Sequence, residues 1–384
     1  MIESTIYDYI YMSIRMHKNA QDRRTYIEKI CDVTLSEIGA VLVDEEKSIH
    51  CENLIGAVSI PLGVAGPLRI RTKKGTKDKY IPLATTEGAL VASVNRGAKI
   101  ISEAGGISVV TEYVGVTRGP IFEVENIKKG QMLISWIDAH HDILAQEATS
   151  TSDHLKLLSI ESVLHGKYVY LRISYDTDQA MGMNMATIAT ARIGSYIKKH
   201  TSARLLAVAG NFDIDKKPSW LNFIKGRGHK VWADVILSQK LVMSHLHVSP
   251  KQIAHVVKQK CWGGSMMSGS IGFNAHFANI VAAFYLATGQ DIAHVVEGSL
   301  GVTSAEVLGN GSLYFAIYAP SLLIGTVGGG TQLKTQSQAR SITKTRTSEE
   351  LAQILAGALL AGELSLLASI TQNTLASSHS LLGR

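Results

Sequence analysis

The sequence predicts an α+β protein in which a large, helix-rich domain is interrupted by a small domain of the ferredoxin-like, split βαβ type. First, residues 107–208 alternate between strand-like and helix-like patterns. Second, the stretches before and after this region are both rich in Gly, Ala and helical patterns. Third, the chain of 384 residues is 46% hydrophobic and 18% charged, a globular composition with room for two or three domains.

These observations give the expected boundaries. Residues 1–50 are polar with helical patterns and are expected to form an N-terminal helical segment. The large domain is expected to comprise residues 51–118 and 219–384, and the small domain residues 119–208. Residues 209–218 are then the loop through which the chain returns to the large domain.

The first long helix of the large domain is predicted over residues 83–106. Thr85 or Thr86 can cap its start by accepting a hydrogen bond from a backbone N–H group of the first turn. Glu87 is expected in that first turn, where a carboxylate interacts favourably with the helix dipole. The glycine pair at 105–106 is expected to end the helix.

The small domain is predicted from the alternation of its segments. Strand patterns are ISVVTEYVGV (107–116), GPIFEVE (119–125), KYVYLRISY (167–175) and ARLLAVAG (203–210). Helical patterns are QMLISWIDAHHDILAQEA (131–148) and AMGMNMATIATARIGSYIKKH (180–200). Strands mixed with two helices in about 90 residues are typical of the split βαβ type.

Several classes of protein are disfavoured. Cys31, Cys51 and Cys261 are widely spaced without a CxxC pair, which argues against a disulfide framework or a zinc site and favours a reducing cytoplasm. The N-terminus lacks the uninterrupted apolar core of a signal peptide. The apolar stretch 354–370 contains Glu363 and is shorter than the ~20 residues that span a bilayer, so we expect a buried helix and no membrane.

The net charge indicates which kinds of ligand the protein is expected to bind. A formal net charge of +6 favours anionic small molecules as ligands. The basic residues are scattered, and the aromatic residues, 6% of the chain, are not interleaved with them, so nucleic-acid binding is not expected.

Common catalytic fingerprints are missing from the sequence. It contains no GxGxxG, GxxxxGK[ST], HExxH or GxSxG, the fingerprints of Rossmann, P-loop, zinc-protease and α/β-hydrolase proteins. Glycines are concentrated in GTVGGGT (325–331) and GGSMMSGSIGFNAH (263–276). Such stretches serve either tight packing and turns or close approach of the backbone to a ligand, and taken alone they do not decide between the two.

Four polar positions stand out beside apolar segments, but each has an ordinary explanation when taken alone. The two lysines of DKKP (215–218) follow a strand-like run and suit a solvated turn. Glu87 suits a helix start, Asp291 a solvated position after a helix, and His379 an exposed chain end. Only their flanking sequences make them candidates for function.

Seven blocks of the sequence occur in the order found in one enzyme family. They are ENLIGAVSIPLGVAGPL (52–68), PLATTEGALVASVNRGAKII (82–101), AMGMNM (180–185), DKKPSWLNFIKGRG (215–228), NAHFANIVAAFYLATGQD (274–291), GTVGGGT (325–331) and LAGELSLLASI (360–370). Together they resemble 3-hydroxy-3-methylglutaryl-coenzyme A (HMG-CoA) reductase. The resemblance runs from about residue 50 to the end and is weakest between about 119 and 168. AMGMNM resembles the class I form, so a soluble class I-like enzyme is expected.

This resemblance implies a reaction and its catalytic residues. The family reduces HMG-CoA to mevalonate and free coenzyme A by two successive hydride transfers, in the mevalonate pathway of isoprenoid biosynthesis. Glu87, Lys216, Asp291 and His379 match its catalytic positions. Lys216 suits stabilisation of an alkoxide, and His379 suits protonation of the departing thiolate. Glu87 can act as the acid if burial and a neighbouring carboxylate such as Asp291 raise its pKa.

Binding residues carry over in the same way. Positions matching those that hold the HMG end are Arg118, Asp215, Lys217 and Asn279, and positions matching coenzyme A contacts are Ser93, Asn95 and Arg96. The small domain is expected to bind the nicotinamide cofactor through Ser152, Asp153, Gln179, Ala180, Met181, Gly182, Met183, Asn184 and Met185. No metal is expected. The family also forms a homodimer with a shared active site, and a higher oligomer is an alternative.

Three positions depart from the family pattern. Gln179 stands where the family usually has Asp, and Ala209 stands where it often has Ser. NADPH is the family default, but Asp153 stands at the position of an Arg in NADPH-using members. A carboxylate repels a 2′-phosphate and can accept hydrogen bonds from a ribose hydroxyl, which favours NADH.

Three other functions were weighed against the reductase. The same enzyme could run in the reverse, catabolic direction with NAD, against which the class I-like AMGMNM argues. A paralogue that binds coenzyme A esters without catalysis is disfavoured because all four catalytic residue types are present. A generic Rossmann dehydrogenase is disfavoured by the missing glycine fingerprint.

Overall fold

The computed structural model describes residues 19–31, 34 and 51–372. The chain divides into two compact units, residues 1–61 and residues 62–384. In the first unit, helix α2 (Ala20–Cys31) follows Asn19, whose Oδ1 accepts a hydrogen bond from the Asp22 amide at 2.8 Å. The helix confirms the predicted helical character of residues 1–50 only for this stretch, since the rest of that segment lies outside the described residues.

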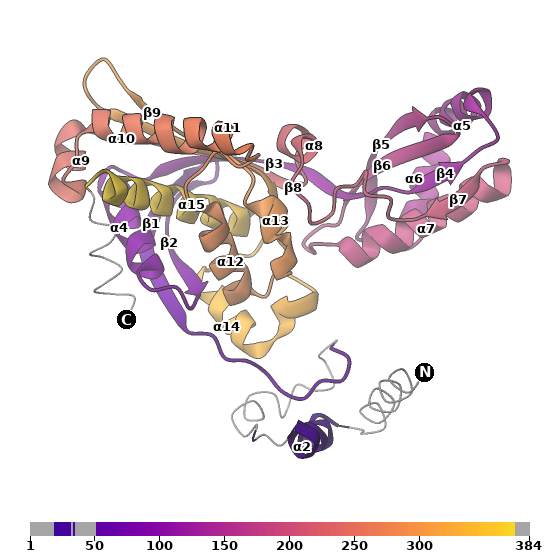
Figure 1. The fold of residues 1–384 in the computed structure, drawn as a ribbon, viewed down its shortest axis with the longest axis horizontal. Helices are drawn as coiled ribbons and strands as arrows, with labels where there is room; N and C mark the ends of the chain where they lie inside the picture. Colours follow the sequence, from indigo (N-terminus) through magenta and orange to yellow (C-terminus); the bar gives the residue numbers. More distant parts are fainter. Residues whose placement is uncertain (1–18, 32–33, 35–50, 373–384) are drawn as a thin grey trace. The chain divides into compact units, whose positions relative to one another are not determined.

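The second unit contains ten strands and most of the described helices (Figure 1). The strands are β1 (Leu62–Thr72), β2 (Gly75–Ala84), β3 (Ile107–Arg118), β4 (Ile121–Glu123), β5 (Lys156–His165), β6 (Tyr168–Asp176), β7 (Arg204–Ala207), β8 (Gly228–Leu237), β9 (Val302–Val307) and β10 (Leu313–Leu322). The α-helices are α4 (Leu90–Glu103), α5 (Ile127–Ala139), α6 (His141–Thr149), α7 (Met183–His200), α8 (Trp220–Lys225), α9 (Gln239–Leu246), α10 (Pro250–Val256), α11 (Ser265–Ser268), α12 (Phe277–Thr288), α13 (Val295–Gly298), α14 (Lys334–Ile342) and α15 (Ser348–Thr371). A π-helix, η2 (Val257–Gly264), and the 3-10 turns η3 (Ile292–His294) and η4 (Gly329–Gln332) complete this set.

The ten strands form one continuous, mostly antiparallel sheet. Its main path is β7-β4-β6-β3-β8-β10-β9, with β1 beside β2 and β3, and β5 beside β6. Strand β3 joins the two ends of the sheet, because its residues 108–115 pair with β8 and its residues 116–118 pair with β6. Figure 1 shows β3 extending from the helix-covered part toward the part that contains α5, α6 and α7.

The smaller part of the sheet has the strand order β7-β4-β6-β5, and every neighbouring pair there is antiparallel. Helices α5 and α6 connect β4 to β5, and α7 connects β6 to β7. The single helix predicted over 131–148 is two helices, which meet at His140. Strand β5 was missed because its residues are mostly half-buried and show no clean apolar alternation.

The larger part contains the many helices predicted for it, but also more strand than the sequence indicated. Strands β1, β2, β8, β9 and β10 all lie in it, so the protein is a mixed α/β protein with a large antiparallel sheet. Residues buried on both faces give short apolar runs, which periodicity cannot distinguish from helix. The last four residues of both β2 and β10 are buried in this way.

Helix α15 passes through the centre of the larger part. It is the one described helix long and apolar enough to cross a membrane, but 83% of its most apolar window is buried inside the protein. The prediction of a buried helix is therefore confirmed. Helix α4 packs so closely against it that a Cβ at Gly97 would lie 2.0 Å from the carbonyl oxygen of Ala361. Only glycine fits at this crossing.

The apolar side chains form two separate clusters. The larger surrounds α15 and includes residues of β1, β2, β8, β10, α4 and α12. The smaller lies among residues 116–205 and includes one distant residue, Leu323. The two parts of the sheet therefore have their own cores, joined by the shared strands.

The predicted helix over residues 83–106 begins later than expected. Its first residue is Leu90, and Ala89 before it has a left-handed φ of 69°. The Glu87 amide donates to Thr85 Oγ1 at 3.0 Å in the turn before the helix, so Glu87 is not in the first helical turn. The glycine pair ends the helix as predicted, with φ of +95° and +100° and the Gly106 amide bonded to the carbonyl of Ile101.

Candidate active site

Lys216 lies on the strained loop that follows β7. Asn211, Ile214 and Lys216 have φ of 66°, 54° and 56°, a region that costs a non-glycine residue about 1 kcal/mol or more. The loop is fixed by buried side chains on both sides. Thr117 Oγ1 donates to the carbonyl of Asp213 at 2.8 Å, and Asn222 Nδ2 donates to the carbonyl of Ile214 at 2.9 Å.

Lys216 meets Asp291 directly. Its Nζ is 2.8 Å from Asp291 Oδ2, and each side chain is a little over one third exposed. Asp291 begins the turn η3, where its Oδ1 accepts from the Ala293 amide at 3.0 Å. Partial burial acts to raise the pKa of Asp291, but the Lys216 and Ala293 hydrogen bonds and the charge of His294 outweigh it and lower the pKa. The structure thus joins two of the predicted catalytic residues.

Asp215, next to Lys216, is held by two arginines. Arg118 Nη1 lies 3.3 Å from Asp215 Oδ2 and 3.1 Å from Asp213 Oδ2, and its Nε donates to Thr187. Arg227 Nη1 lies 3.1 Å from Asp215 Oδ1. Burial acts to raise the pKa of Asp215, but the nearby positive charges, Arg227 first, lower it. Arg118, expected to bind the HMG end, is thus also part of the loop's own support.

Lys217 points to a different partner from Lys216. Its Nζ donates to the carbonyl of Asp215 at 3.3 Å, and the side chain is exposed. Two adjacent lysines therefore present their ammonium groups separately, as expected if they have different tasks.

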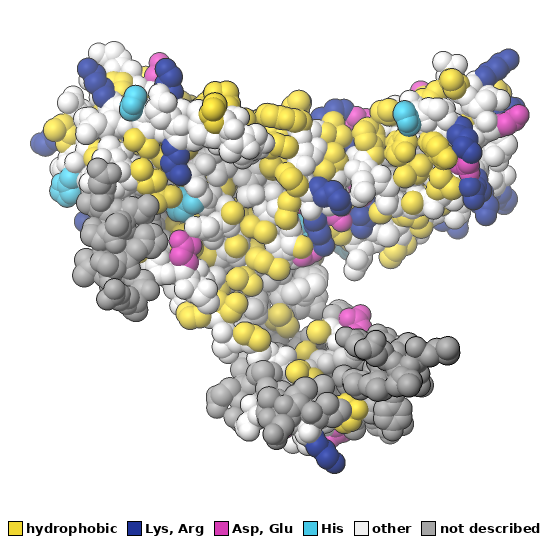
Figure 2. Space-filling view, in the orientation of Figure 1, with side chains coloured by type: hydrophobic (Ala, Val, Ile, Leu, Met, Phe, Trp, Pro, Cys, Tyr) yellow, Lys and Arg dark blue, Asp and Glu magenta, His cyan; other side chains and the backbone are white. Residues whose placement is uncertain are grey.

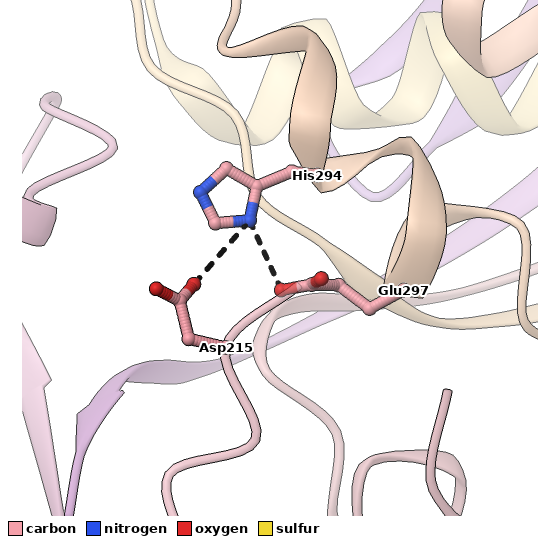
Figure 3. A group of neighbouring side chains, drawn as sticks. All are labelled: Asp215, His294 and Glu297. Carbon is pink, nitrogen blue, oxygen red and sulfur yellow. Dashed lines mark hydrogen bonds and ion pairs between the residues drawn. The ribbon is translucent and has the colours of Figure 1, made fainter. Parts of the chain in front are cut away.

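A buried cluster lies directly beneath this loop. Figure 3 shows His294 with one ring nitrogen facing the carboxylates of Asp215 and Glu297. The donor atoms of these three residues lie within 4.8 Å of one another, a spacing that a metal ion could use. The guanidinium of Arg227 already forms ion pairs with both carboxylates, so we interpret the group as an ion-pair cluster.

Glu87 is in a separate group of contacts. Its Oε1 accepts from Asn279 Nδ2 at 3.2 Å, and both residues are exposed. Asp291, the carboxylate expected beside Glu87, contacts Lys216 instead, and no hydrogen bond or ion pair among residues 51–372 joins the two groups. Asn279 also lines a cavity of about 950 Å³ that reaches Pro218.

The predicted coenzyme A contacts all bond to other parts of this chain, with Ser93 and Arg96 half-buried and Asn95 exposed. Ser93 Oγ donates to Ser365 Oγ at 2.9 Å, and Arg96 donates to Ser365 Oγ at 3.0 Å and its carbonyl at 2.6 Å. Asn95 Oδ1 accepts from the Gly66 amide at 3.0 Å. Burial lowers the pKa of Arg96. These side chains tie α4 to α15 and β1.

The predicted cofactor turn packs against the glycine-rich loop at 325–331. The Thr326 amide donates to the carbonyl of Gln179 at 2.8 Å, and a Cβ at Gly325 would lie 2.4 Å from the Met181 nitrogen. Gly182 has a φ of +86° and starts α7 without a side-chain cap. An uncapped helix start leaves backbone N–H groups available for an anion such as a pyrophosphate.

A second cavity, of about 440 Å³, lies beside this turn. Asp153, Gln179 and Asp178 line it on one side, and Tyr113 and His229 on another. Ser152 lies next to it, where its Oγ accepts from the His154 amide. The side-chain oxygen of Gln179 accepts from the Ser348 amide at 2.8 Å, so this departure from the family pattern ties the turn to the start of α15.

Sequence reasoning missed the buried residues of the site. Arg227, His294 and Glu297 are fully buried; Arg227 and His294 contact the predicted residues Asp215 and Asp291, and Glu297 contacts both Arg227 and His294. The available signal was that Arg227 falls in the block 215–228 and that His294 and Glu297, three residues apart, share one helical face. His379, predicted to be catalytic, lies outside the described residues.

Charged side chains elsewhere are dispersed. Figure 2 shows Lys and Arg at several separate places on the visible face of the described residues rather than in one continuous patch.

Comparisons with known proteins identify the family of this chain. The family model described as hydroxymethylglutaryl-coenzyme A reductase matches residues 19–384. The chain is 45% identical over 368 residues to a 3-hydroxy-3-methylglutaryl-coenzyme A reductase of Methanothermobacter thermautotrophicus, covering 94% of this chain and 92% of that one. It is 44% identical over 374 residues to the Pyrococcus horikoshii reductase, covering 94% and 91%.

Solved structures show the same fold at much lower identity. A class II 3-hydroxy-3-methylglutaryl-CoA reductase from Streptococcus pneumoniae, bound to NADPH in open conformations, matches with a TM-score of 0.70 and 17% identity. The match covers 92% of this chain and 97% of that one. Since this neighbour is described as class II, the class I-like prediction gains no support from it. The family model and the relatives establish that this chain belongs to the hydroxymethylglutaryl-coenzyme A reductase family.

Proposed function

We propose that this protein reduces HMG-CoA to mevalonate and free coenzyme A in two hydride transfers, within the mevalonate pathway of isoprenoid biosynthesis. Family membership supports the overall reaction. The observation that carries the chemistry is the Lys216–Asp291 pair, at 2.8 Å, on a strained loop near a cavity. An ammonium group held by the backbone at a defined place suits a reaction in which a carbonyl oxygen becomes an alkoxide.

Each catalytic group has a defined task. In the first reduction Lys216 stabilises the oxygen of the thioester carbon as negative charge develops there. The carbon–sulfur bond then breaks, and His379 gives its proton to the departing thiolate. In the second reduction the aldehyde oxygen becomes an alkoxide at Lys216, and Glu87 gives it the proton that completes the alcohol. Asp291 pairs with Lys216 and orients its ammonium group.

The cofactor site fits a reduced nicotinamide dinucleotide, which supplies the hydrides when bound. The fit rests on the uncapped start of α7 and on Gly182 and Gly325, which bring bare backbone to the surface of the turn. We infer that Ser152, Asp153 and the segment 179–185 hold it.

The catalytic proposal is tested by Lys216→Ala. Initial rates of cofactor oxidation and thiol release should fall by about 10³-fold or more, the loss expected when a group that stabilises the oxyanion is removed. Binding of coenzyme A, followed by calorimetry, should stay within about threefold. The matched control is Lys240→Ala, an exposed lysine of α9. A Lys216 variant with activity close to that of the control would remove Lys216 from this role.

We propose NADH rather than NADPH as the preferred cofactor. Asp153 lines the cavity of about 440 Å³ together with Asp176, Asp178 and Glu349, and Lys156 is its one lysine. His154 also lines it, but its Nδ1 is 3.2 Å from Asp178 Oδ2 and so already has a carboxylate partner. A 2′-phosphate placed beside Asp153 meets an uncompensated carboxylate.

The test compares kcat/KM for NADH and NADPH. The wild type should prefer NADH, and Asp153→Arg should shift the ratio toward NADPH by about tenfold or more. Asp142→Arg, at a fully exposed side chain of α6, is the control for added charge. A wild-type preference for NADPH contradicts the proposal.

Finer points of the organisation are also proposals. We infer a homodimer with a shared active site, because Glu87 and Lys216 lie in separate contact groups within one chain. The domain division at residues 118–119, 208–209 and 218–219 is supported by the two apolar clusters, and the strand order β7-β4-β6-β5 supports a ferredoxin-like small domain. The class I-like assignment rests on AMGMNM alone, and a cytoplasmic location rests on the sequence alone. Sedimentation equilibrium tests the dimer, and a monomer with full activity would contradict it.

A further inference from the structure

We propose that His294 is a positioning residue, which acts through Asp291 and Lys216 and sets the pH range in which this pair works. The His294 ring is fully buried between three carboxylates. Its Nδ1 lies 3.0 Å from Glu297 Oε1 and 3.9 Å from Asp215 Oδ1 (Figure 3). Its Nε2 lies on the opposite side of the ring, 3.7 Å from Asp291 Oδ2.

Both ring nitrogens of His294 face a carboxylate, Nδ1 toward Glu297 and Nε2 toward Asp291. A neutral imidazole has one N–H group and one lone pair, so one of its nitrogens would present a lone pair to a carboxylate. The charge of His294 is among the causes that lower the pKa of Asp291 and of Asp215. A positive His294 therefore acts on the carboxylate that pairs with Lys216.

The local charge balance supports the same conclusion. Beneath the loop, the carboxylates of Asp213, Asp215 and Glu297 face two guanidinium groups, those of Arg118 and Arg227. These groups lie in the interior or at its edge, where an unbalanced charge is costly. A positive His294 supplies the third positive charge, so that three cations meet three carboxylates.

Other groups around the ring are consistent with this arrangement. Tyr285, on α12, is fully buried, and its pKa is raised first by burial and then by Glu297 and Asp291. Its hydroxyl therefore stays neutral and adds no charge. Lys216, on the loop, is the remaining charged neighbour, and it is paired with Asp291 at 2.8 Å.

The cluster links the catalytic pair to the cofactor helix. Arg227 Nε donates to Thr117 Oγ1 at 2.8 Å on β3, and its Nη2 lies 2.8 Å from Met183 Sδ at the start of α7. Segments that carry Lys216, Asp291 and the cofactor turn therefore meet at one buried group. A change of charge in this group changes the pKa of Asp291 most directly, because Asp291 Oδ2 faces both His294 and Lys216.

The test changes two neighbouring positions that act on Asp291 through the same ring. His294→Gln removes a positive neighbour of Asp291, so the acidic limb of the kcat–pH profile should move up by about one pH unit. Glu297→Gln removes a carboxylate that stabilises the charge of His294, so the limb should also move up, but by less. The double variant should move no further than His294→Gln alone. KM for HMG-CoA should change less than threefold in each, because His294 is fully buried and does not line the cavity.

His245→Gln is the matched control. His245 Nε2 is 2.8 Å from Glu103 Oε2, so this substitution also removes a histidine–carboxylate pair, but one distant from Asp291 in the sequence and not in contact with it. It should leave the limb unchanged. If both cluster variants lose kcat equally at every pH, or if the double variant shifts the limb by the sum of the two single shifts, the role of His294 is structural only and the proposal is wrong. Should one variant fail to fold, the direction of the shift in the other still decides.

Discussion

Replacing Glu363 with leucine should remove one of the main polar anchors of the core. Glu363 is fully buried in the apolar helix α15, an unusual place for a carboxylate. Its two oxygens accept three hydrogen bonds, from the amides of Ala275 and His276 at 2.8 and 2.7 Å and from Thr303 Oγ1 at 2.7 Å. These bonds join α15 to the segment that starts α12 and to β9.

The size of the effect follows from the orphaned donors. A buried donor that loses its partner costs about 1–3 kcal/mol, and hydrogen bonds to a charged group lie at the upper end. Loss of three partners in Glu363→Leu, offset by the gain of an apolar side chain, should lower the free energy of unfolding by about 3–5 kcal/mol. Glu363→Gln should lower it by only about 1–2 kcal/mol, since its oxygen keeps one amide and its NH₂ can donate to the hydroxyl of Thr303.

Urea unfolding at a fixed protomer concentration measures these differences, because association changes apparent stability. Glu306→Gln, at an exposed position on β9, is the control and should stay within about 0.5 kcal/mol of the wild type. A Glu363→Leu variant that loses less than about 1 kcal/mol would refute the reasoning, because it would mean that the three donors find other partners.

Two further substitutions test packing and buried charge. Gly97→Ala should destabilise the protein by about 2 kcal/mol or more in thermal unfolding, because the added Cβ would lie 2.0 Å from the carbonyl oxygen of Ala361. Gly309→Ala is the control and should not destabilise the protein in this way, because its Cβ would have no other atom within 4 Å. Burial lowers the pKa of His229 from 6.5 to about 4, so between these pH values the unfolded chain binds a proton that the folded chain does not. Stability should therefore be complete above about pH 6.5 and fall as the pH drops toward 4, and His229→Phe should flatten that slope in pH-dependent urea unfolding.

The sequence predicted the parts of the molecule that depend on neighbours along the chain. The glycine pair that ends α4 and the helix α7 after AMGMNM follow from local backbone chemistry. Lys216 and Asp291 were both named as catalytic from the resemblance to a family, but Asp291 was expected beside Glu87, and its contact with Lys216 was not predicted. No spacing rule joins two residues that lie 75 positions apart, since one sequence carries no record of which distant segments meet.

The buried polar residues show why the remainder escaped prediction. Arg227 was an ordinary basic residue in a glycine-rich turn until the fold placed it against Glu297, 70 residues away. Glu363 was evidence against a membrane span, but its partners come from two segments that only the folded chain brings together. A buried polar group is explained by its partners, and those are tertiary information.

Strain in the loop that carries Lys216 explains how two adjacent lysines acquire different partners. In an extended backbone, successive side chains point to opposite sides in a fixed alternation. The left-handed φ of 56° at Lys216 breaks that alternation, so its Nζ reaches Asp291 while Lys217 Nζ returns to the carbonyl of Asp215. Such a backbone persists only where surrounding bonds over-determine it. Thr117 and Asn222 supply those bonds, which makes them supports of the Lys216–Asp291 pair although neither lines the cavity of about 950 Å³.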